Sequence, residues 1–159
     1  MKLWSAAVAP NPRRVEIYLM EKGIEVETEN IDLGAKANYE PEFVAMNPLA
    51  RVPVLELDDG TFLAESKAIC RYFEETHPKP PLLGSNTQER ALIEMWDRRM
   101  ESELMGNITG AFRHLHPYWD GRIEQIPAYG EICKKNAEDR MAWLDGELAS
   151  RDYIAGDCL

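Results

Sequence analysis

The chain has 159 residues, of which 45% are hydrophobic and 29% charged, and 28 Asp and Glu against 18 Lys and Arg give it a formal net charge of −10. This acidity argues against nucleic acid or an anionic membrane as a main partner. Apolar runs fall well short of the roughly 20 residues that a membrane span needs, and the first residues lack a signal-peptide pattern. We therefore expect a soluble cytoplasmic protein.

Three widely spaced cysteines favour the same location. Cys70, Cys133 and Cys158 are odd in number and form no Cys-x-x-Cys pair, so they fit reduced cytosolic thiols better than disulfides or a metal cage. His114 and His116 form a His-x-His pair, but no Cys or third His lies near them in the sequence, and zinc sites need three or four ligands. We predict no metal site.

The first part of the chain predicts a β-α-β unit. Lys2–Trp4 reads as a strand, and the alternation between residues 25 and 31 predicts a second one. Between them, Asn11 is a suitable N-cap, Pro12 suits the first helical position, and Gly23 is a typical stop. One face of this helix is predicted to be buried: Val15, Tyr18, Leu19 and Lys22.

A polar loop over residues 32–40 follows the second predicted strand. The next helix opens at Pro41 and is short, because the residue before Pro48 avoids the helical conformation. We expect it to end near Asn47.

Residues 51–66 form the most informative segment. Strand formers surround Pro53, which removes a ladder donor and therefore belongs at a strand start or an edge. Residues 58–60 (Asp-Asp-Gly) predict a hairpin turn, and a helix begins at Glu65-Ser66. A helix N-terminus suits a carboxylate, so pairing it with the Glu65 carboxylate indicates a ligand that carries both charges, such as an α-amino acid.

The pattern changes after the proline-rich segment 78–81, which reads as a linker. Two rows of apolar residues then recur every four positions: Leu92, Trp96, Met100, Leu104, Ile108 and Phe112, and Cys133, Ala137, Met141, Leu144 and Leu148. They predict long helices packed face to face. We expect a first domain over 1–77, a linker over 78–86 and an all-helical domain over 87–159.

This order of elements resembles the soluble glutathione transferase family across essentially the whole chain, and most of all a bacterial branch near the phi, theta and yeast-type enzymes. The matching pieces are Pro10–Val15, Glu21–Gly23, Pro41–Phe43, Asn47–Leu49, Arg51–Leu55, and Glu65-Ser66 followed by Ile69. The resemblance implies an α/β plus all-α fold. Its thioredoxin-like N-terminal domain has a mixed four-stranded sheet with helices, and an all-helical C-terminal domain follows. Tyr153–Asp157 looks like the start of the family's N-capping segment, after which further helices normally come, so we expect the helical domain to be truncated here.

The resemblance also implies an activity and a binding site. Family members attack electrophiles with the thiolate of glutathione, their co-substrate, without a metal, in detoxification and as homodimers. By resemblance, the backbone of Val52 before a cis Pro53 pairs with the cysteinyl part of glutathione. Glu65 then holds the γ-glutamyl amine and Ser66 its carboxylate. The remaining candidates are Arg51 beside the peptide, and Lys36 and Asn38 for the glycine carboxylate.

The group that lowers the thiol pKa stays open in the sequence. Ala9 and Pro10 stand where the resemblance implies the serine or cysteine of other members. Ser5 or Asn11 could donate to the sulfur, and His114 could act as a base through a water. Each has an ordinary alternative: a serine satisfying a strand end, a helix cap, and a histidine at a helix C-terminus.

The electrophile pocket is expected from Met105, Ile108, Thr109 and Phe112, although part of that row must be ordinary core. Two alternatives follow from the missing serine. One is a glutathione-binding protein with little transferase activity, and the other is a glutathione-dependent isomerase or dehalogenase. A thiol reductase is disfavoured, because Cys70 falls on the inner side of its predicted helix.

Overall fold

The computed structural model describes residues 1–156, so Asp157 and Cys158 of the sequence predictions lie outside the described residues. The chain divides into two compact units, the first covering Met1–Leu82 and the second beginning at Leu83. Each unit is described by itself. Within the described residues, none of the helices combines the length and the apolar composition needed to cross a bilayer.

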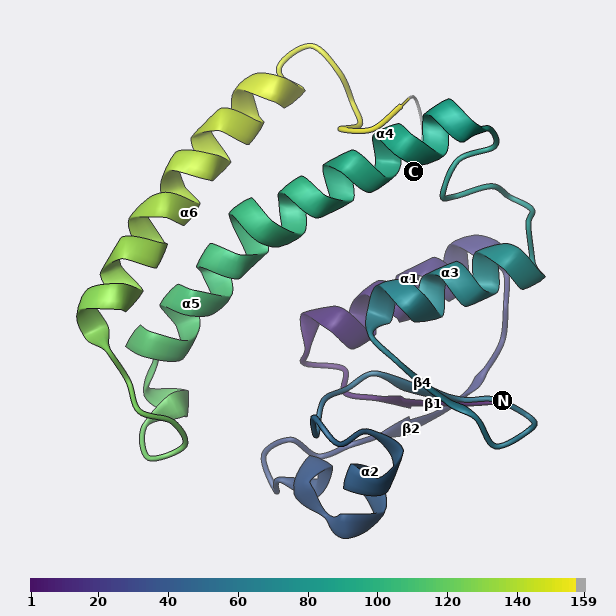
Figure 1. The fold of residues 1–159 in the computed structure, drawn as a ribbon, viewed down its shortest axis with the longest axis horizontal. Coiled ribbons are helices and arrows are strands. Elements are labelled where there is room, and N and C mark those ends of the chain that lie inside the picture. The colour runs from purple at the N-terminus through teal and green to yellow at the C-terminus, as the bar shows by residue number, and fades with distance from the viewer. Residues whose placement is uncertain (157–159) are drawn as a thin grey trace. The chain divides into compact units, whose positions relative to one another are not determined.

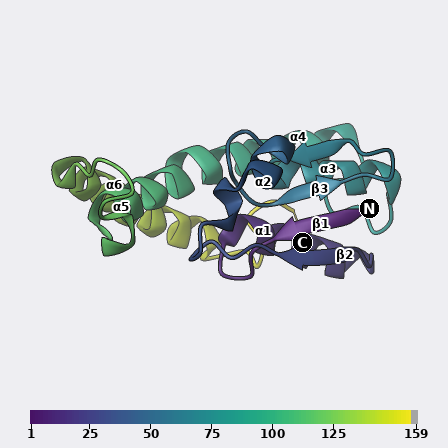
Figure 2. The same cartoon turned by 90° about the horizontal axis from the view of Figure 1, so that it is seen from below.

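Unit 1 is built on a mixed four-stranded sheet in the order β2-β1-β3-β4. The strands are β1 (Lys2–Ser5), β2 (Glu27–Asn30), β3 (Val54–Glu56) and β4 (Phe62–Ala64). β1 and β2 are parallel, whereas β3 is antiparallel to both β1 and β4. Figure 2 shows β3, β1 and β2 side by side. The sheet therefore matches the mixed four-stranded sheet expected from the sequence.

Helices cover both faces of this sheet. α1 (Pro10–Lys22) and α3 (Ser66–Thr76) pack together on one face, and α2 (Pro41–Met46) lies on the other, after a short 3-10 turn, η1 (Ala37–Tyr39) (Figure 1). The main core lies under α1 and α3 and contains Leu3, Val15, Leu19, Leu55, Ile69, Cys70 and Phe73. A smaller cluster of Ile31, Phe43 and Val54 lies at α2. Burying these side chains is the main favourable contribution to folding of the unit.

The start of α1 corrects one prediction. Ala9 is extended and the helix begins at Pro10, so Asn11 is the second helical residue and not the N-cap. Two prolines fit this first turn because its N–H groups have no partner inside the helix. The predicted stop at Gly23 is confirmed: its φ is 65°, in the left-handed region that glycine adopts at little cost.

The second strand is shorter and more polar than predicted. All four residues of β2 are exposed, and the apolar Ile24, Val26 and Ile31 lie beyond its two ends. β2 pairs with β1 at the edge of the sheet, where Lys2 forms ion pairs with Glu27 and Glu29. The hydrogen bond to Glu29 is the main cause of a raised pKa at Lys2.

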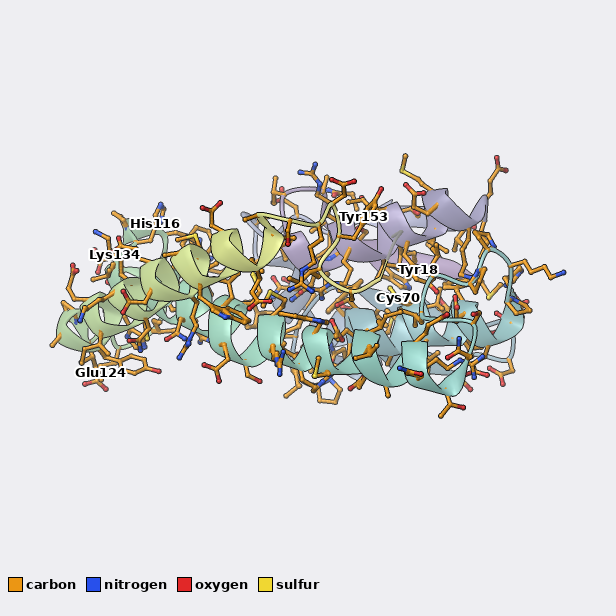
Figure 3. All side chains as sticks on the ribbon, turned by 90° about the horizontal axis from the view of Figure 1, so that it is seen from above. Tyr18, Cys70, His116, Glu124, Lys134 and Tyr153 are labelled. Atoms are coloured by element: carbon orange, nitrogen blue, oxygen red, sulfur yellow. The ribbon has the colours of Figure 1, made fainter. Side chains whose placement is uncertain are left out.

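The C-terminal end of α1 carries a buried cation. The Lys22 side chain is fully buried, and Nζ lies 2.6 Å from Glu74 Oε2 on α3. It also donates to the carbonyls of His77 and Pro80, each at 2.7 Å. Tyr18, labelled in Figure 3, donates to the same Glu74 oxygen, and burial followed by this bond raises the pKa of Tyr18. The network fixes the chain after α3 to α1.

Unit 2 is helical. Its elements are α4 (Thr87–Arg99), a π-helical segment η2 (Met100–Met105), α5 (Gly106–Leu115), a 3-10 turn η3 (Pro117–Trp119) and α6 (Pro127–Leu148). α5 and α6 run side by side (Figure 1), and a glycine on each admits the other helix. A Cβ on Gly110 would lie 2.6 Å from Cys133 Sγ, and a Cβ on Gly130 would lie 2.7 Å from Leu115 Cγ.

The two apolar rows predicted for this unit are only partly buried. Trp96, Cys133 and Ala137 are buried, whereas Leu92 and Phe112 are 45% and 43% exposed. An α-helix has 3.6 residues per turn, so each step of four residues drifts about 40° around the helix. A strict row of this spacing therefore cannot stay on one buried face.

Candidate functional site

One edge of unit 1 brings the hairpin motif together. β3 and β4 are antiparallel, with Val54 opposite Ala64, so Val52-Pro53 before β3 lies beside Glu65-Ser66 after β4. The Val52–Pro53 peptide bond is cis. Pro53 is buried and Val52 is half-buried. The residues expected to hold an amino-acid ligand are thus neighbours across the hairpin.

Glu65 adopts an unusual backbone conformation at this edge. It is the N-cap of α3 with φ 69° and ψ 113°, and its side chain makes no capping hydrogen bond. A positive φ is uncommon for a residue with a Cβ, and such strain gathers at binding sites. Because Glu65 is exposed, the turn presents a carboxylate to the surroundings next to the first residue of a helix.

Ser66 is the first helical residue of α3, directly after the N-cap Glu65. It is only 6% exposed. Its Oγ accepts a hydrogen bond of 2.7 Å from Nη1 of Arg14, which also donates to Asn11 Oδ1 at 3.2 Å. The first turns of α1 and α3 are therefore joined through one guanidinium group.

Ser5 is not placed to donate to a thiolate. It is 1% exposed, and its Oγ donates to a carboxylate oxygen of Glu16 on α1. A serine hydroxyl has one proton, and here this proton is already used. The loop that follows β1 is Ala6-Ala7-Val8-Ala9 and offers no hydroxyl, so Asn11 is the nearest predicted candidate with a side-chain donor.

His114 is held in a defined state in unit 2. Its Nδ1 accepts a hydrogen bond of 3.0 Å from the backbone N–H of Ile126, and its ring meets that of Tyr129 edge to face. In a neutral imidazole one nitrogen accepts and the other donates, so the proton lies on Nε2. Protonating Nδ1 would break the bond to Ile126. His114 is therefore better suited to donate from Nε2 than to act as a base.

The loop before β3 is braced by two buried asparagines. Asn38 Nδ2 donates to the Ala50 carbonyl at 2.7 Å, and Asn47 Nδ2 donates to the Arg51 carbonyl at 2.8 Å. The Asn38 amide is thus used to shape the loop, whereas Lys36 is exposed with a φ of 61°. Asn47 was missed from the sequence, where its place before a proline indicated only a helix end. Its bond fixes the backbone directly before Val52.

The predicted electrophile residues lie on unit 2. Met105 ends η2, and Ile108, Thr109 and Phe112 are exposed on α5. Phe112 belongs to an aromatic group, with ring centroids 4.9 Å from His116 and 6.2 Å from Tyr118. Figure 3 labels His116 at the end of this unit. These side chains offer aromatic and apolar surface to a small molecule.

Within 1–156, no group of three or more His, Cys, Asp or Glu could hold a metal ion. Cys70 and Cys133 are both buried.

Comparisons with known proteins agree with this geometry. Residues 8–76 match the family model of the glutathione S-transferase N-terminal domain. Over 161 residues, the chain is 35% identical to glutathione S-transferase 2 of Saccharomyces cerevisiae, covering 99% of this chain and 69% of the relative. The structure of Gtt2 from Saccharomyces cerevisiae is 34% identical and has a TM-score of 0.92, covering 100% of this chain and 78% of that one.

A second solved structure points the same way. A glutathione S-transferase domain-containing protein from Marinobacter aquaeolei VT8 is 39% identical with a TM-score of 0.88, and the match covers 99% of this chain and 78% of that chain. These matches span both units. They confirm the predicted thioredoxin-like domain followed by a helical one.

Proposed function

Because this chain belongs to the glutathione S-transferase family, we propose that it is a glutathione transferase, which conjugates the glutathione thiolate to small apolar electrophiles. The observation that carries this proposal is the pairing of Val52–cis-Pro53 with Glu65-Ser66 across one hairpin. The pair combines the backbone before a cis-proline, a carboxylate and a helix N-terminus at one end of the β3-β4 hairpin.

Each of these groups has a chemical counterpart in glutathione. The backbone of Val52 pairs with the cysteinyl unit, the Glu65 carboxylate binds the γ-glutamyl ammonium, and Ser66 with the first N–H groups of α3 binds its carboxylate. Lys36 and Arg51 are the exposed cations available for the glycine carboxylate. Asn38 supports this end of the site indirectly, through its bond to Ala50.

Thiol activation falls to groups other than Ser5. A free thiol has a pKa of about 8.5, so a transferase must stabilise the thiolate. The Asn11 side chain directs its oxygen to Arg14, which leaves its amide N–H groups as donors toward the sulfur. We propose Asn11 as the principal donor, and the His114 variant below tests the base through a water that the sequence suggested. The electrophile would contact Met105, Ile108, Thr109 and Phe112.

A specific observation favours a second candidate. The hydroxyl of Ser5 is occupied by Glu16, and the following loop carries only alanines and a valine. A glutathione-binding protein with little transferase activity would have this composition. A glutathione-dependent isomerase or dehalogenase on the same scaffold would use the same binding edge.

The test is a titration of bound glutathione, in which thiolate absorbance in the ultraviolet is followed against pH. Wild type, Asn11→Ala, Ser5→Ala and His114→Ala are compared, and turnover of an aryl halide is measured alongside. A thiol pKa well below its free value in wild type, raised by Asn11→Ala, supports the transferase. Tight binding with an unshifted thiol pKa supports the binding protein instead. Absence of glutathione binding contradicts both.

The location, the oligomeric state and the biological role of the chain are also proposals. By family analogy we propose a cytoplasmic homodimer that acts in detoxification. Light scattering coupled to size exclusion gives the mass of the purified chain in solution. A monomer at micromolar concentration would contradict the dimer without affecting the glutathione site.

A further inference from the structure

Arg14 stands out among the residues near Glu65-Ser66, because it joins the first turns of α1 and α3. Its Nη1 lies 2.7 Å from Ser66 Oγ and 3.2 Å from Asn11 Oδ1. It is half-buried, whereas the adjacent Arg13 is exposed. The two arginines are equivalent in the sequence, and the structure gives only one of them these contacts.

The direction of the hydrogen bond determines what Ser66 can do. A guanidinium group only donates, so Ser66 Oγ must be the acceptor in this pair. The Ser66 proton is therefore left for another acceptor. Since Ser66 is 6% exposed and begins α3, its hydroxyl has little freedom to turn elsewhere. Arg14 thus prepares Ser66 as a donor.

The positive charge of Arg14 also favours binding of a carboxylate at Ser66. A guanidinium bonded to a hydroxyl that itself donates to a carboxylate forms a chain of polarised hydrogen bonds, and such chains strengthen each bond in them. The positive charge also offsets the desolvation of a carboxylate brought to this edge. Glu65, the next residue to Ser66, is the group that would repel a carboxylate here, so a compensating cation is needed close by.

We propose that Arg14 is a positioning residue for the γ-glutamyl α-carboxylate, acting through Ser66. The inference rests on the proposed function, because it assigns a role within that same site. It makes recognition of one of the two carboxylates of glutathione depend on a residue of α1, 52 positions before Ser66 in the chain.

The experiment measures dissociation constants calorimetrically for three peptides on the purified chain. Glutathione carries both γ-glutamyl charges, 4-aminobutanoyl-Cys-Gly lacks the α-carboxylate, and glutaryl-Cys-Gly lacks the amine. We expect Arg14→Met to weaken glutathione and glutaryl-Cys-Gly by about tenfold or more, the usual effect of losing a charge-assisted hydrogen bond. Binding of 4-aminobutanoyl-Cys-Gly should change much less, because without the α-carboxylate only the longer bond from Arg14 to Asn11, at 3.2 Å, is lost.

Two further variants separate positioning from general disruption. In a Ser66→Ala background, the effect of Arg14→Met on glutathione should shrink, since both residues serve one contact. Arg13→Met is the matched control and should leave all three affinities unchanged. If Arg14→Met does not fold, Arg14→Lys carries the test, with about fivefold weaker glutathione binding and no loss for 4-aminobutanoyl-Cys-Gly.

The outcomes distinguish this inference from the proposed function. Equal losses for all three peptides, or no loss for any, would overturn the role of Arg14 while wild-type binding upholds the glutathione site. Full additivity of Arg14→Met and Ser66→Ala would also overturn it. A wild-type chain that binds none of the peptides overturns the proposed function and this inference with it.

Discussion

The two ends of α1 each carry a cation that reaches α3, and they use it differently. At the C-terminal end, Lys22 is fully buried and its ammonium group meets Glu74 and two backbone carbonyls. An ammonium group has three donors, so the chain itself satisfies all of them. At the N-terminal end, Arg14 is half-buried and, within the described part of the chain, bonds through Nη1 alone.

This difference separates a structural cation from one suited to a ligand. A buried charge whose donors are all paired contributes to stability, and removing its partner leaves a buried group unsatisfied. A cation with donors to spare beside a strained, exposed carboxylate can add a contact when a ligand arrives. Variants at the C-terminal end of α1, around Lys22, should therefore change the free energy of unfolding and leave glutathione affinity unchanged.

The largest effect is expected at Lys22. Lys22→Met removes the buried ammonium group that lies 2.6 Å from the Glu74 carboxylate, whose side chain is 14% exposed, and breaking such a pair typically costs about 3–5 kcal/mol. Urea unfolding followed by tryptophan fluorescence measures the loss. The exposed Lys134→Met on unit 2 is the control and should lose almost nothing. Adding Glu74→Gln to Lys22→Met should recover part of the stability. A small loss at Lys22 would mean that the network is not cooperative.

A smaller effect is expected for Ser5→Ala. Removing the bond that Ser5 donates to the half-buried Glu16 should lower the free energy of unfolding by about 1–3 kcal/mol. At saturating glutathione, kcat should stay at the wild-type value, because the hydroxyl is buried away from any ligand. A fall in kcat with unchanged stability would restore Ser5 as the thiolate donor.

Gly23→Ala tests the end of α1 through backbone conformation alone. The position has φ 65°, and no atom lies within 4 Å of an added Cβ, so the cost comes only from the left-handed conformation, about 1–2 kcal/mol. Thermal unfolding should show this loss while glutathione affinity is unchanged. A neutral result would show that the chain can leave α1 by another path.

The smallest effect depends on pH and involves Tyr18. Burial and Glu74 raise its pKa, so the folded chain keeps a proton that the unfolded chain loses above about pH 10. Stability from this group is therefore complete below pH 10 and falls as pH rises further. Between pH 9 and 11, the unfolding free energy of Tyr18→Phe should fall less steeply with pH than that of the wild type, each measured relative to its own value at pH 7. Equal slopes for the two proteins would exclude Tyr18 as the source.

The contrast between the two ends of α1 also marks what the sequence could predict. Local signals placed the strands, the stop at Gly23, the hairpin around Pro53 and the start of α3. They even placed Lys22 on the buried stripe, which was a sign of a buried cation. The contacts that define the site were out of reach, because Arg14 meets Ser66 and Lys22 meets Pro80 across more than fifty residues.

Two other errors have local causes. Asn11 was expected to cap the helix because its residue type favours that position, but Ala9 takes the place when Pro10 opens the helix. Apolar residues at every fourth position give no indication of the π-helical segment Met100–Met105. The proposed domain limits of 1–77, 78–86 and 87–159 stay a prediction.

The paired glycines of α5 and α6 have a mechanical consequence. The glycine of each helix leaves room for a side chain of the other helix: Cys133 lies against Gly110, and Leu115 lies against Gly130. Sliding one helix along the other in either direction would drive a side chain into a backbone. The two helices are therefore interlocked, and we expect them to move together as one rigid body.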